Sequence, residues 1–241
     1  MKVVILAGGL GTRMGEESRK IPKPMIEIGG IPIIIHIMNR YSSFGINDFI
    51  ICGGHKLNIL KKKFNELSQS NIKWKKACKS LNVKVVDTGE KTMTGGRIKR
   101  VEKYLDNQTF CLTYGDTLND LNIEKVIKFH KKQKMLATVI ACKPNEKFGI
   151  LDLNDSTVIK FQEKPKSKNW VNGGYFVLEP EVLDYIKNDS TVWEQEPMTK
   201  LVKKRELSAY RHSGFYQPMD TINEKNYLEK LWKEKKALWK V

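Results

Sequence analysis

The sequence predicts an α/β protein with a mostly parallel central sheet covered by helices on both faces. Two observations predict this fold class. Short apolar runs rich in β-branched residues alternate along the chain with amphipathic, helix-like segments. The apolar runs are continuous, which is typical of strands buried on both faces. A strand–helix–strand order of this kind gives parallel strands joined by crossover helices.

The first 144 residues carry this alternation most clearly. Val3–Leu6 is the first buried strand. A helix is expected from Pro32, because proline is favoured in the first helical turn, to Gly45, because glycine commonly ends helices. Further strands are expected at 25–28, 48–52, 83–86, 110–114 and 136–141, and further helices at 58–67, 98–105 and 123–133.

After residue 144 the pattern changes to shorter strands, which indicates a mixed or antiparallel part of the sheet. The chain has no internal repeat and no Gly/Ser-rich linker. It is therefore predicted to form a single three-layer α/β/α domain over residues 1–241, with a first part at 1–144 and a second at 145–241. The second part is expected to contain strands at 149–153, 158–162 and 174–178, helices at 197–204 and 223–236, and two short extended pieces before Asp220.

Composition excludes several functional classes. The net charge of +16 invites a nucleic-acid-binding interpretation, but the lysines are dispersed and there is no arginine-rich tract or zinc-finger spacing. No apolar run approaches the ~20 residues that span a bilayer, and the N-terminus lacks a signal-peptide pattern. The four widely spaced cysteines indicate free thiols in a reducing compartment. We therefore expect a cytoplasmic protein without nucleic-acid or membrane partners.

The first strand leads directly into a glycine-rich loop with a basic segment after it. Gly8, Gly9 and Gly11 allow backbone N–H groups to approach phosphate oxygens, and Arg13 adds a planar cationic fork. Lys23 lies between two prolines that hold its segment extended. The loop lacks the Gly-Lys-Ser/Thr ending of a Walker motif and the third glycine of a dinucleotide fingerprint. An ordinary glycine-rich turn is the alternative, and the basic residues favour a polyphosphate site.

At these residues the chain resembles the sugar-phosphate nucleotidyltransferases. The resemblance covers nearly the whole chain and is strongest to the cytidylyl branch, the glucose-1-phosphate cytidylyltransferases. It is carried by these segments: Leu6-Ala7-Gly8-Gly9-Leu10-Gly11-Thr12-Arg13, Lys23-Pro24-Met25, Asp87-Thr88-Gly89, Met93-Thr94-Gly95-Gly96-Arg97, Thr113-Tyr114-Gly115-Asp116, Phe161-Gln162-Glu163-Lys164-Pro165, Asn172-Gly173-Gly174, Trp193-Glu194-Gln195-Glu196-Pro197 and Gln217-Pro218-Met219-Asp220-Thr221.

The resemblance implies a Rossmann-like fold of the nucleotide-diphospho-sugar transferase type and a defined reaction. A cytidylyl group passes from CTP to α-D-glucose 1-phosphate, giving CDP-glucose and pyrophosphate, on a route to surface polysaccharide. Arg13 and Lys23 are implied as the catalytic pair. The implied nucleotide-binding residues are Leu6, Ala7, Gly8, Gly9, Leu10, Gly11, Thr12, Arg13, Thr92, Arg97 and Gly115.

The same resemblance assigns the metal and the sugar phosphate. Asp116 and Asp220 are implied as a Mg²⁺ pair, although each could instead cap a helix or stabilise a turn. For Thr92 and Arg97 the alternative is turn chemistry around Gly95-Gly96. The implied sugar-phosphate-binding residues are Lys23, Glu163, Lys164, Asn172 and Gly173. The alternative is an exposed charged turn for Glu163 and Lys164, and a turn into the next strand for Asn172 and Gly173.

Three other functions stay open from the sequence. The first is the same reaction with UTP, dTTP or GTP, or with another sugar 1-phosphate. The second is a non-catalytic sugar-nucleotide-binding module, against which the presence of Arg13, Lys23, Asp116 and Asp220 counts. The third is a basic nucleic-acid binder. The resemblance also implies a homo-oligomer, but the connection at 69–82 is shorter than in the family, which leaves subunit contacts and base selectivity open.

Overall fold

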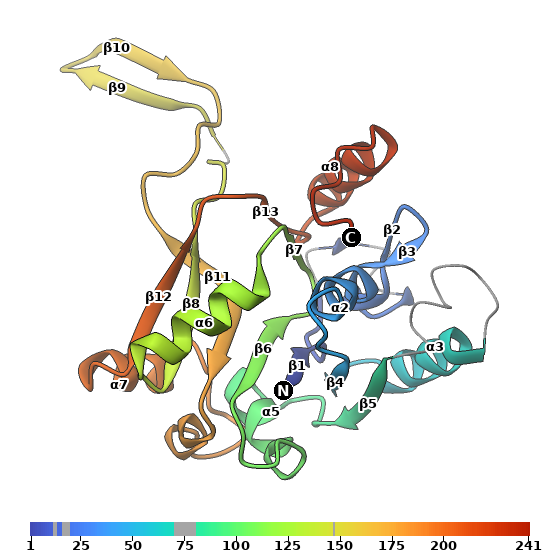
Figure 1. Ribbon diagram of the computed structural model, residues 1–241. Helices are drawn as coiled ribbons and strands as arrows, with labels where there is room; N and C mark the ends of the chain where they lie inside the picture. Colours follow the sequence, from blue (N-terminus) through green and yellow to red (C-terminus); the bar gives the residue numbers. More distant parts are fainter. Residues whose placement is uncertain (12–13, 16–19, 70–80, 147) are drawn as a thin grey trace.

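A seven-stranded sheet organises the chain (Figure 1). The structure is a computed structural model, and it describes residues 1–241 except 12–13, 16–19, 70–80 and 147. The strands lie in the order β12-β8-β11-β6-β1-β4-β5. Their bounds are β1 Lys2–Leu6, β4 Asp48–Gly53, β5 Asn82–Asp87, β6 Phe110–Tyr114, β8 Ala137–Cys142, β11 Val171–Leu178 and β12 Leu207–His212.

The sheet is mostly parallel, as predicted. β1 pairs in parallel with β4 and β6, β4 with β5, and β8 with β12. β11 runs antiparallel between β6 and β8, and its register shifts between Asn172 and Phe176. The change from parallel to antiparallel pairing therefore occurs in the second part of the chain, where the sequence indicates it.

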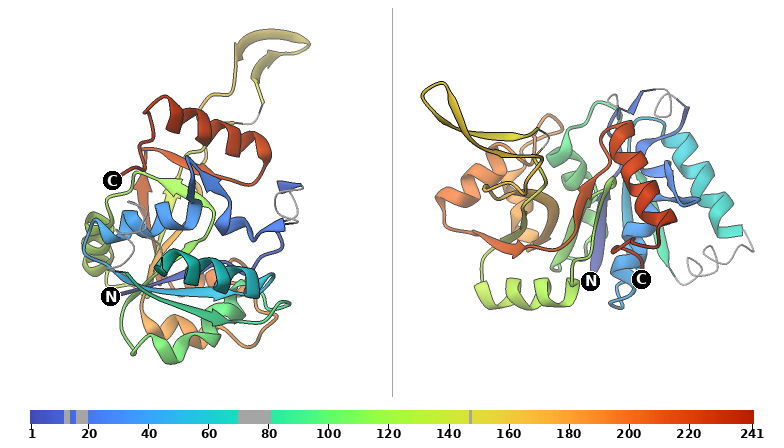
Figure 2. Two further views of the ribbon diagram at one scale, coloured as in Figure 1. Left: turned by 90° about the vertical axis from the view of Figure 1, so that its right-hand side faces the viewer. Right: turned by 90° about the horizontal axis from the view of Figure 1, so that it is seen from above.

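Alternate residues of the central strands enter two different cores, because side chains of a strand alternate between its faces. Val3 and Ile5 of β1 join one core, and Val4 joins the other. The first core receives apolar side chains from α2, α3 and α6, and the second from α5 and α7. Figure 2 shows helices on both sides of the sheet. The helices are α2 Ile33–Ser42, α3 Leu57–Gln69, α5 Thr94–Arg100, α6 Ile123–Gln133, α7 Glu196–Lys203 and α8 Ile222–Lys233, with 3-10 turns η2 Lys23–Met25, η4 Glu102–Tyr104 and η5 Pro180–Tyr185.

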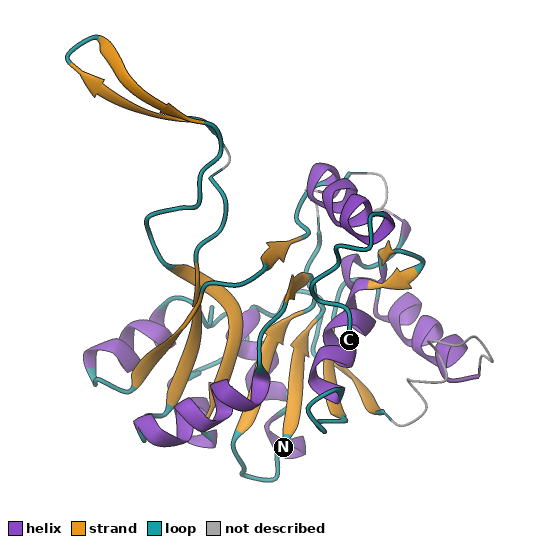
Figure 3. Cartoon of the chain, turned by 45° about the horizontal axis from the view of Figure 1, so that its top comes forward, coloured by secondary structure: helices purple, strands orange, loops and turns teal. Residues whose placement is uncertain are grey.

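Three two-stranded ribbons complete the fold. β7 (Thr117–Asn119) pairs with β13 (Tyr216–Pro218), and β2 (Glu27–Ile28) with β3 (Ile31–Pro32). The third ribbon, β9 (Ile150–Asn154) with β10 (Thr157–Gln162), projects away from the body of the molecule (Figures 1 and 3).

The C-terminal helix α8 packs against the β2–β3 ribbon. The backbone N–H of Gly29 donates to Glu229 Oε1 at 3.0 Å. Gly29 adopts a φ of +61°, and a Cβ there would lie 2.1 Å from Trp232 Nε1. This contact holds the second half of α8 beside the N-terminal part of the chain.

The predicted helix starts lie within one residue of the observed ones, except for the start of α5. The helix expected from residue 98 begins at Thr94. Gly95 and Gly96 lie inside it because neither leaves room for a side chain: a Cβ would be 2.7 Å from Thr191 O and 2.6 Å from Asp189 Cα, respectively. The glycine pair therefore permits close packing. Pro32 precedes α2 as its N-cap and closes β3.

The expectation for the connection at 69–82 concerns residues 70–80, which lie outside the described residues. Within the described part of the chain, no helix is long and apolar enough to cross a bilayer.

Candidate active site

A cavity of about 950 Å³ lies at the carboxyl ends of β1 and β6. Ligands of open α/β sheets bind at this edge. The cavity brings together most of the residues predicted for nucleotide, phosphate and metal. Those that line it are Leu6, Ala7, Gly8, Gly9, Leu10, Gly11, Lys23, Thr92, Arg97, Gly115, Asp116 and Asp220. Thr12 and Arg13 lie outside the described residues.

One ammonium joins two carboxylates in this cavity. Lys23 Nζ donates to Asp116 Oδ2 and to Asp220 Oδ1, both at 2.6 Å. The Lys23 side chain is 10% exposed, and the two aspartate side chains are about a quarter exposed. The two carboxylates, distant in sequence, therefore converge on one point.

The β7–β13 ribbon produces this convergence. Pro218 lies opposite Thr117 in the ribbon, and the Met219 N–H donates to Asp116 O at 2.9 Å. The next residue is Asp220. Thr221 caps α8 and forms a capping box with Glu224. The helix-cap alternative for Asp220 is therefore wrong, because the cap is the residue that follows it.

The electrostatics of the cluster favour a further cation. Burial by itself lowers the pKa of Lys23, but the two neighbouring carboxylates outweigh it and raise the pKa above its ordinary value. Two carboxylates and one ammonium leave one formal negative charge facing the cavity. Unlike charges attract strongly in such partly desolvated sites.

The donor set fits a magnesium ion held with a nucleotide. Among the described residues, no group of three or more His, Cys, Asp or Glu side chains could hold a metal. Mg²⁺ is commonly bound by one or two carboxylates, with substrate phosphates and water completing its shell. Asp116 and Asp220 provide these oxygen ligands, and the cavity provides room for phosphates.

Arg97 fixes the walls of the cavity from inside. Its Nη2 donates to Gly8 O and Glu90 O, at 3.0 and 3.1 Å. Its Nη1 donates to Gly53 O, Thr88 Oγ1 and Gly89 O, at 2.8 to 3.2 Å. The guanidinium thus joins the glycine loop to the last residue of β4 and to the segment that follows β5. In this structure its donors meet protein acceptors, and contact with a nucleotide stays a prediction.

Close packing leaves no room for a side chain at Gly8 or Gly115. A Cβ on Gly8 would lie 2.1 Å from Arg97 Nη1, and one on Gly115 would lie 3.0 Å from Leu6 O and 3.1 Å from Pro24 Cγ. Both glycines therefore let neighbouring segments approach at the cavity wall. Thr92 is buried in the same wall.

The residues predicted for the sugar phosphate are divided in space. Asn172 lies beside Tyr114, which lines the cavity, with Asn172 Nδ2 3.5 Å from Tyr114 Oη. Gly173 lies against Cys142, whose Sγ would be 2.7 Å from a Cβ at position 173. Glu163 and Lys164 follow β10 directly, are each 61% exposed, and pair with each other at 3.2 Å. Neither residue is among the described side chains that line the cavity.

Sequence reasoning missed three polar residues that the fold joins at the cavity. Tyr114 lines it, and Glu194 accepts hydrogen bonds from both Tyr114 and Thr94. Each of the three belongs to a segment that carries the family resemblance, and this membership could have identified them as candidates. Spacing alone could not show that these segments meet.

The described cysteines do not provide a nucleophile. Cys52, Cys111 and Cys142 are buried free thiols. Burial raises the pKa of each to about 12. Since the thiolate is the reactive form, these side chains are inert at neutral pH.

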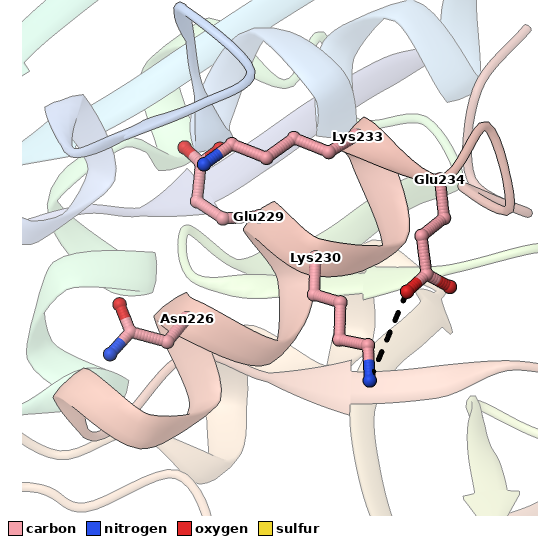
Figure 4. A pocket seen from close by; sticks show the side chains of 5 residues that line it. All are labelled: Asn226, Glu229, Lys230, Lys233 and Glu234. Atoms are coloured by element: carbon pink, nitrogen blue, oxygen red, sulfur yellow. Dashed lines mark ion pairs between the residues drawn. The ribbon is translucent and has the colours of Figure 1, made fainter.

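A second hollow, of about 440 Å³, lies along α8 (Figure 4). Its described lining comes from one helix, and within it Lys230 pairs with Glu234 at 3.8 Å. Its mixed charges point to no ligand class. The lining side chains are Asn226, Glu229, Lys230, Lys233 and Glu234.

Replacing Arg97 with lysine tests its role in the cavity wall. An ammonium cannot reproduce five bonds in a planar fork, so carbonyls around Gly8 and Gly53 lose donors. We expect the free energy of unfolding in urea to fall by about 2–3 kcal/mol. The matched control is Arg100→Lys on the same helix, whose ion pair with Asp189 is exposed; we expect a change within about 0.5 kcal/mol. Equal losses in both variants would contradict the role of Arg97.

Comparisons with known proteins show the family to which the chain belongs. The nucleotidyl transferase family matches residues 2–233. The glucose-1-phosphate cytidylyltransferase of Salmonella typhimurium is 50% identical over 254 aligned positions, covering 100% of this chain and 99% of that protein. Mannose-1-phosphate guanyltransferase 2 of Candida glabrata is 30% identical, over 95% of this chain and 63% of that protein. A UDP-glucose pyrophosphorylase complexed with UDP-glucose superimposes with a TM-score of 0.76 at 16% identity, covering 97% and 98% of the two chains, which shows a shared fold. The chain therefore belongs to the nucleotidyl transferase family, and the resemblance to glucose-1-phosphate cytidylyltransferases predicted from its motifs is confirmed.

Proposed function

We propose that this protein transfers a cytidylyl group from CTP to α-D-glucose 1-phosphate, giving CDP-glucose and pyrophosphate. The observation that carries the proposal is the 50% identity, over the full chain, to a glucose-1-phosphate cytidylyltransferase. The cavity supports it independently. A glycine loop, a buried lysine and two convergent carboxylates are the groups that phosphate transfer requires.

The reaction is a direct displacement at phosphorus. A phosphate oxygen of glucose 1-phosphate attacks the α-phosphorus of CTP. The bond from that phosphorus to the bridging oxygen of pyrophosphate breaks, and pyrophosphate leaves with the electron pair. The nucleophile is already anionic, so no general base is needed. Positioning and charge neutralisation supply the catalysis.

Each cavity element has a proposed part in that displacement. The backbone N–H groups of Gly8 to Gly11, with Arg13, hold the β- and γ-phosphates. Lys23 offsets the negative charge that grows between the two reacting phosphates. Asp116 and Asp220 would hold Mg²⁺, which when bound supplies further charge neutralisation at the phosphates.

We also propose that the two parts of the chain bind different substrates. Residues 1–144 hold the nucleotide through the glycine loop, Thr92, Arg97 and Gly115. Residues 145–241 hold the sugar phosphate. Asn172 has a position beside the cavity that supports this role. Glu163 and Lys164 reach the sugar phosphate only when the exposed segment after β10 is brought to the cavity.

Another nucleotide or sugar is the second candidate. The similarity to a mannose-1-phosphate guanyltransferase, at 30% identity, shows that sequences of this kind occur in proteins named for another base and another sugar. A base is selected by a few hydrogen bonds, and part of the glycine loop lies outside the described residues.

Pyrophosphate release tests the reaction and the base together. The protein is incubated with Mg²⁺ and glucose 1-phosphate, in parallel with CTP, UTP, dTTP, ATP and GTP. We expect release with CTP alone. Release with a different nucleotide would support the reaction class but contradict the assignment of cytosine as the base. If no pyrophosphate is released with any nucleotide, or with other sugar 1-phosphates, the result would favour a non-catalytic sugar-nucleotide-binding module.

Replacing Lys23 with alanine separates catalysis from folding. We expect turnover to fall by about 10²–10³-fold, the loss typical of one removed electrostatic donor. Added Mg²⁺ should raise the melting temperature of this variant more than that of the wild type, because two carboxylates then face each other without an ammonium. Lys125→Ala, a substitution on α6 away from the cavity, is the control and should change neither value. Near-normal turnover of Lys23→Ala would exclude the proposed role.

We further propose that the protein forms a homo-oligomer through the β9–β10 ribbon. The cross-strand pairs Leu151–Phe161 and Leu153–Val158 share one face. These four side chains are 50–60% exposed. An isolated two-stranded ribbon is marginally stable in water, so an apolar face on it favours a partner. A second copy offers the same face, as a two-fold contact requires. Covering the ribbon would also order Glu163 and Lys164, which continue from β10.

The mass in solution tests this assembly. We expect light scattering to give a multiple of 27.8 kDa for the wild type. Leu153→Glu, on the apolar face, should shift the mass toward that of one chain. Gln162→Glu introduces the same side chain on the opposite face and should leave the mass unchanged. A wild type at 27.8 kDa would overturn the proposal.

A further inference from the structure

Four segments meet in one hydrogen-bond network beside the cavity. Tyr114 Oη donates to Glu194 Oε1, and Thr94 Oγ1 donates to Glu194 Oε2 at 2.6 Å. The backbone N–H of Trp193 donates to Thr94 Oγ1 at 2.9 Å. Asn172 Nδ2 lies 3.5 Å from Tyr114 Oη. The reaction described above assigns no part to Tyr114 or Glu194.

The direction of each hydrogen bond in this network is fixed by chemistry. A backbone N–H can only donate, so the Thr94 hydroxyl accepts from Trp193 and gives its own proton to Glu194. A carboxylate can only accept, so the proton of Tyr114 also goes to Glu194. Burial raises the pKa of Tyr114 above its ordinary value, so the phenol keeps that proton at neutral pH.

Asn172 cannot reverse this direction. Its Oδ1 accepts from the Gly174 N–H at 2.8 Å, which turns its Nδ2 toward Tyr114. The amide is therefore a donor to the phenol oxygen. Since Tyr114 has one proton and that proton is committed, the phenol oxygen can only accept from a ligand.

The ring of Tyr114 is held in place at the cavity wall. Gly174, with a φ of +73°, packs so closely that a Cβ there would lie 2.4 Å from Tyr114 Cδ2. Phe176 meets the ring edge to face, with centroids 6.4 Å apart. The hydroxyl end lies beside Asn172, a residue proposed to contact the sugar. An acceptor thus stands in a fixed position on the sugar side of the cavity.

We infer that Tyr114 is a specificity-determining residue that accepts a hydrogen bond from one hydroxyl of the sugar, and that Glu194 is the positioning residue that makes it an acceptor. The inference rests on the proposed function and extends it. A sugar with a hydroxyl at that position satisfies Tyr114. A sugar with fluorine or hydrogen there leaves the phenol oxygen with only the long 3.5 Å contact from Asn172 as a donor, which costs binding in the transition state.

The test compares glucose 1-phosphate with its 2-, 3-, 4- and 6-deoxyfluoro analogues, using CTP, Mg²⁺ and pyrophosphate release. In the wild type we expect kcat/KM to fall by about 10-fold or more at the position facing Tyr114. In Tyr114→Phe, which keeps the ring, that loss should shrink to about threefold or less. In Glu194→Gln the amide can donate to the phenol and release its proton toward the ligand, so the same loss should shrink.

The control is Glu196→Gln, the same substitution on the same segment, where the carboxylate pairs with Lys187 and Lys200 at the surface. It should keep the wild-type pattern across the four analogues. A purely structural role of Glu194 would lower activity on all substrates and leave their ratios unchanged. That result, or an unchanged pattern in Tyr114→Phe, would overturn the inference and leave the proposed function standing. A wild type inert toward glucose 1-phosphate would instead overturn the proposed function, and with it the sugar contact.

Discussion

The convergence of Asp116 and Asp220 on Lys23 is the interaction on which the site depends. It joins the 3-10 turn η2, the connection between β6 and β7, and the residue before the N-cap of α8. Bringing two carboxylates together costs free energy unless a cation lies between them. Lys23 is that cation in this structure, and the charge that remains suits a metal held with phosphates. The β7–β13 ribbon and the capping box of α8 fix the two aspartates from outside the cavity.

The walls of the cavity depend on a second buried charge. Arg97 donates five hydrogen bonds to one hydroxyl and four carbonyls, which come from the last residue of β4 and from the segments after β1 and β5. A buried guanidinium is tolerated only when its donors are satisfied, and the carbonyls in turn need donors. The glycine loop is therefore held in shape before any ligand binds. Such preorganisation is what electrostatic catalysis requires, because a fixed site needs no rearrangement at the moment of reaction.

The cavity wall around Tyr114 is held by a different kind of contact. Tyr114, Glu194 and Asn172 approach the cavity from three segments and form a polar network at its wall. Glu163 and Lys164 are carried instead on the exposed segment after the β9–β10 ribbon. The ribbon has an apolar face and extends away from the sheet (Figure 3). The proposed covering of the ribbon by a second copy would bury its apolar face and would order these two residues.

The fold class, the strands of the central sheet and many of the residues that line the cavity can be predicted from the sequence. Continuous apolar runs such as Val3–Leu6 can only be buried on both faces, and side-chain alternation then fixes two cores. The residues that follow such strands, among them Gly8 and Asp116, must lie at one edge of a parallel sheet. Contacts between segments far apart in the sequence cannot be predicted from residue spacing, and the folded structure is needed to see them. The meeting of Asp116 with Asp220 depends on the pairing of β7 with β13. The helical conformation of Gly95 and Gly96 depends on their packing against residues 189–191. The direction of the hydrogen bond from Tyr114 depends on the carboxylate of Glu194. Each of these is a contact between distant segments, and local propensity holds no information about it.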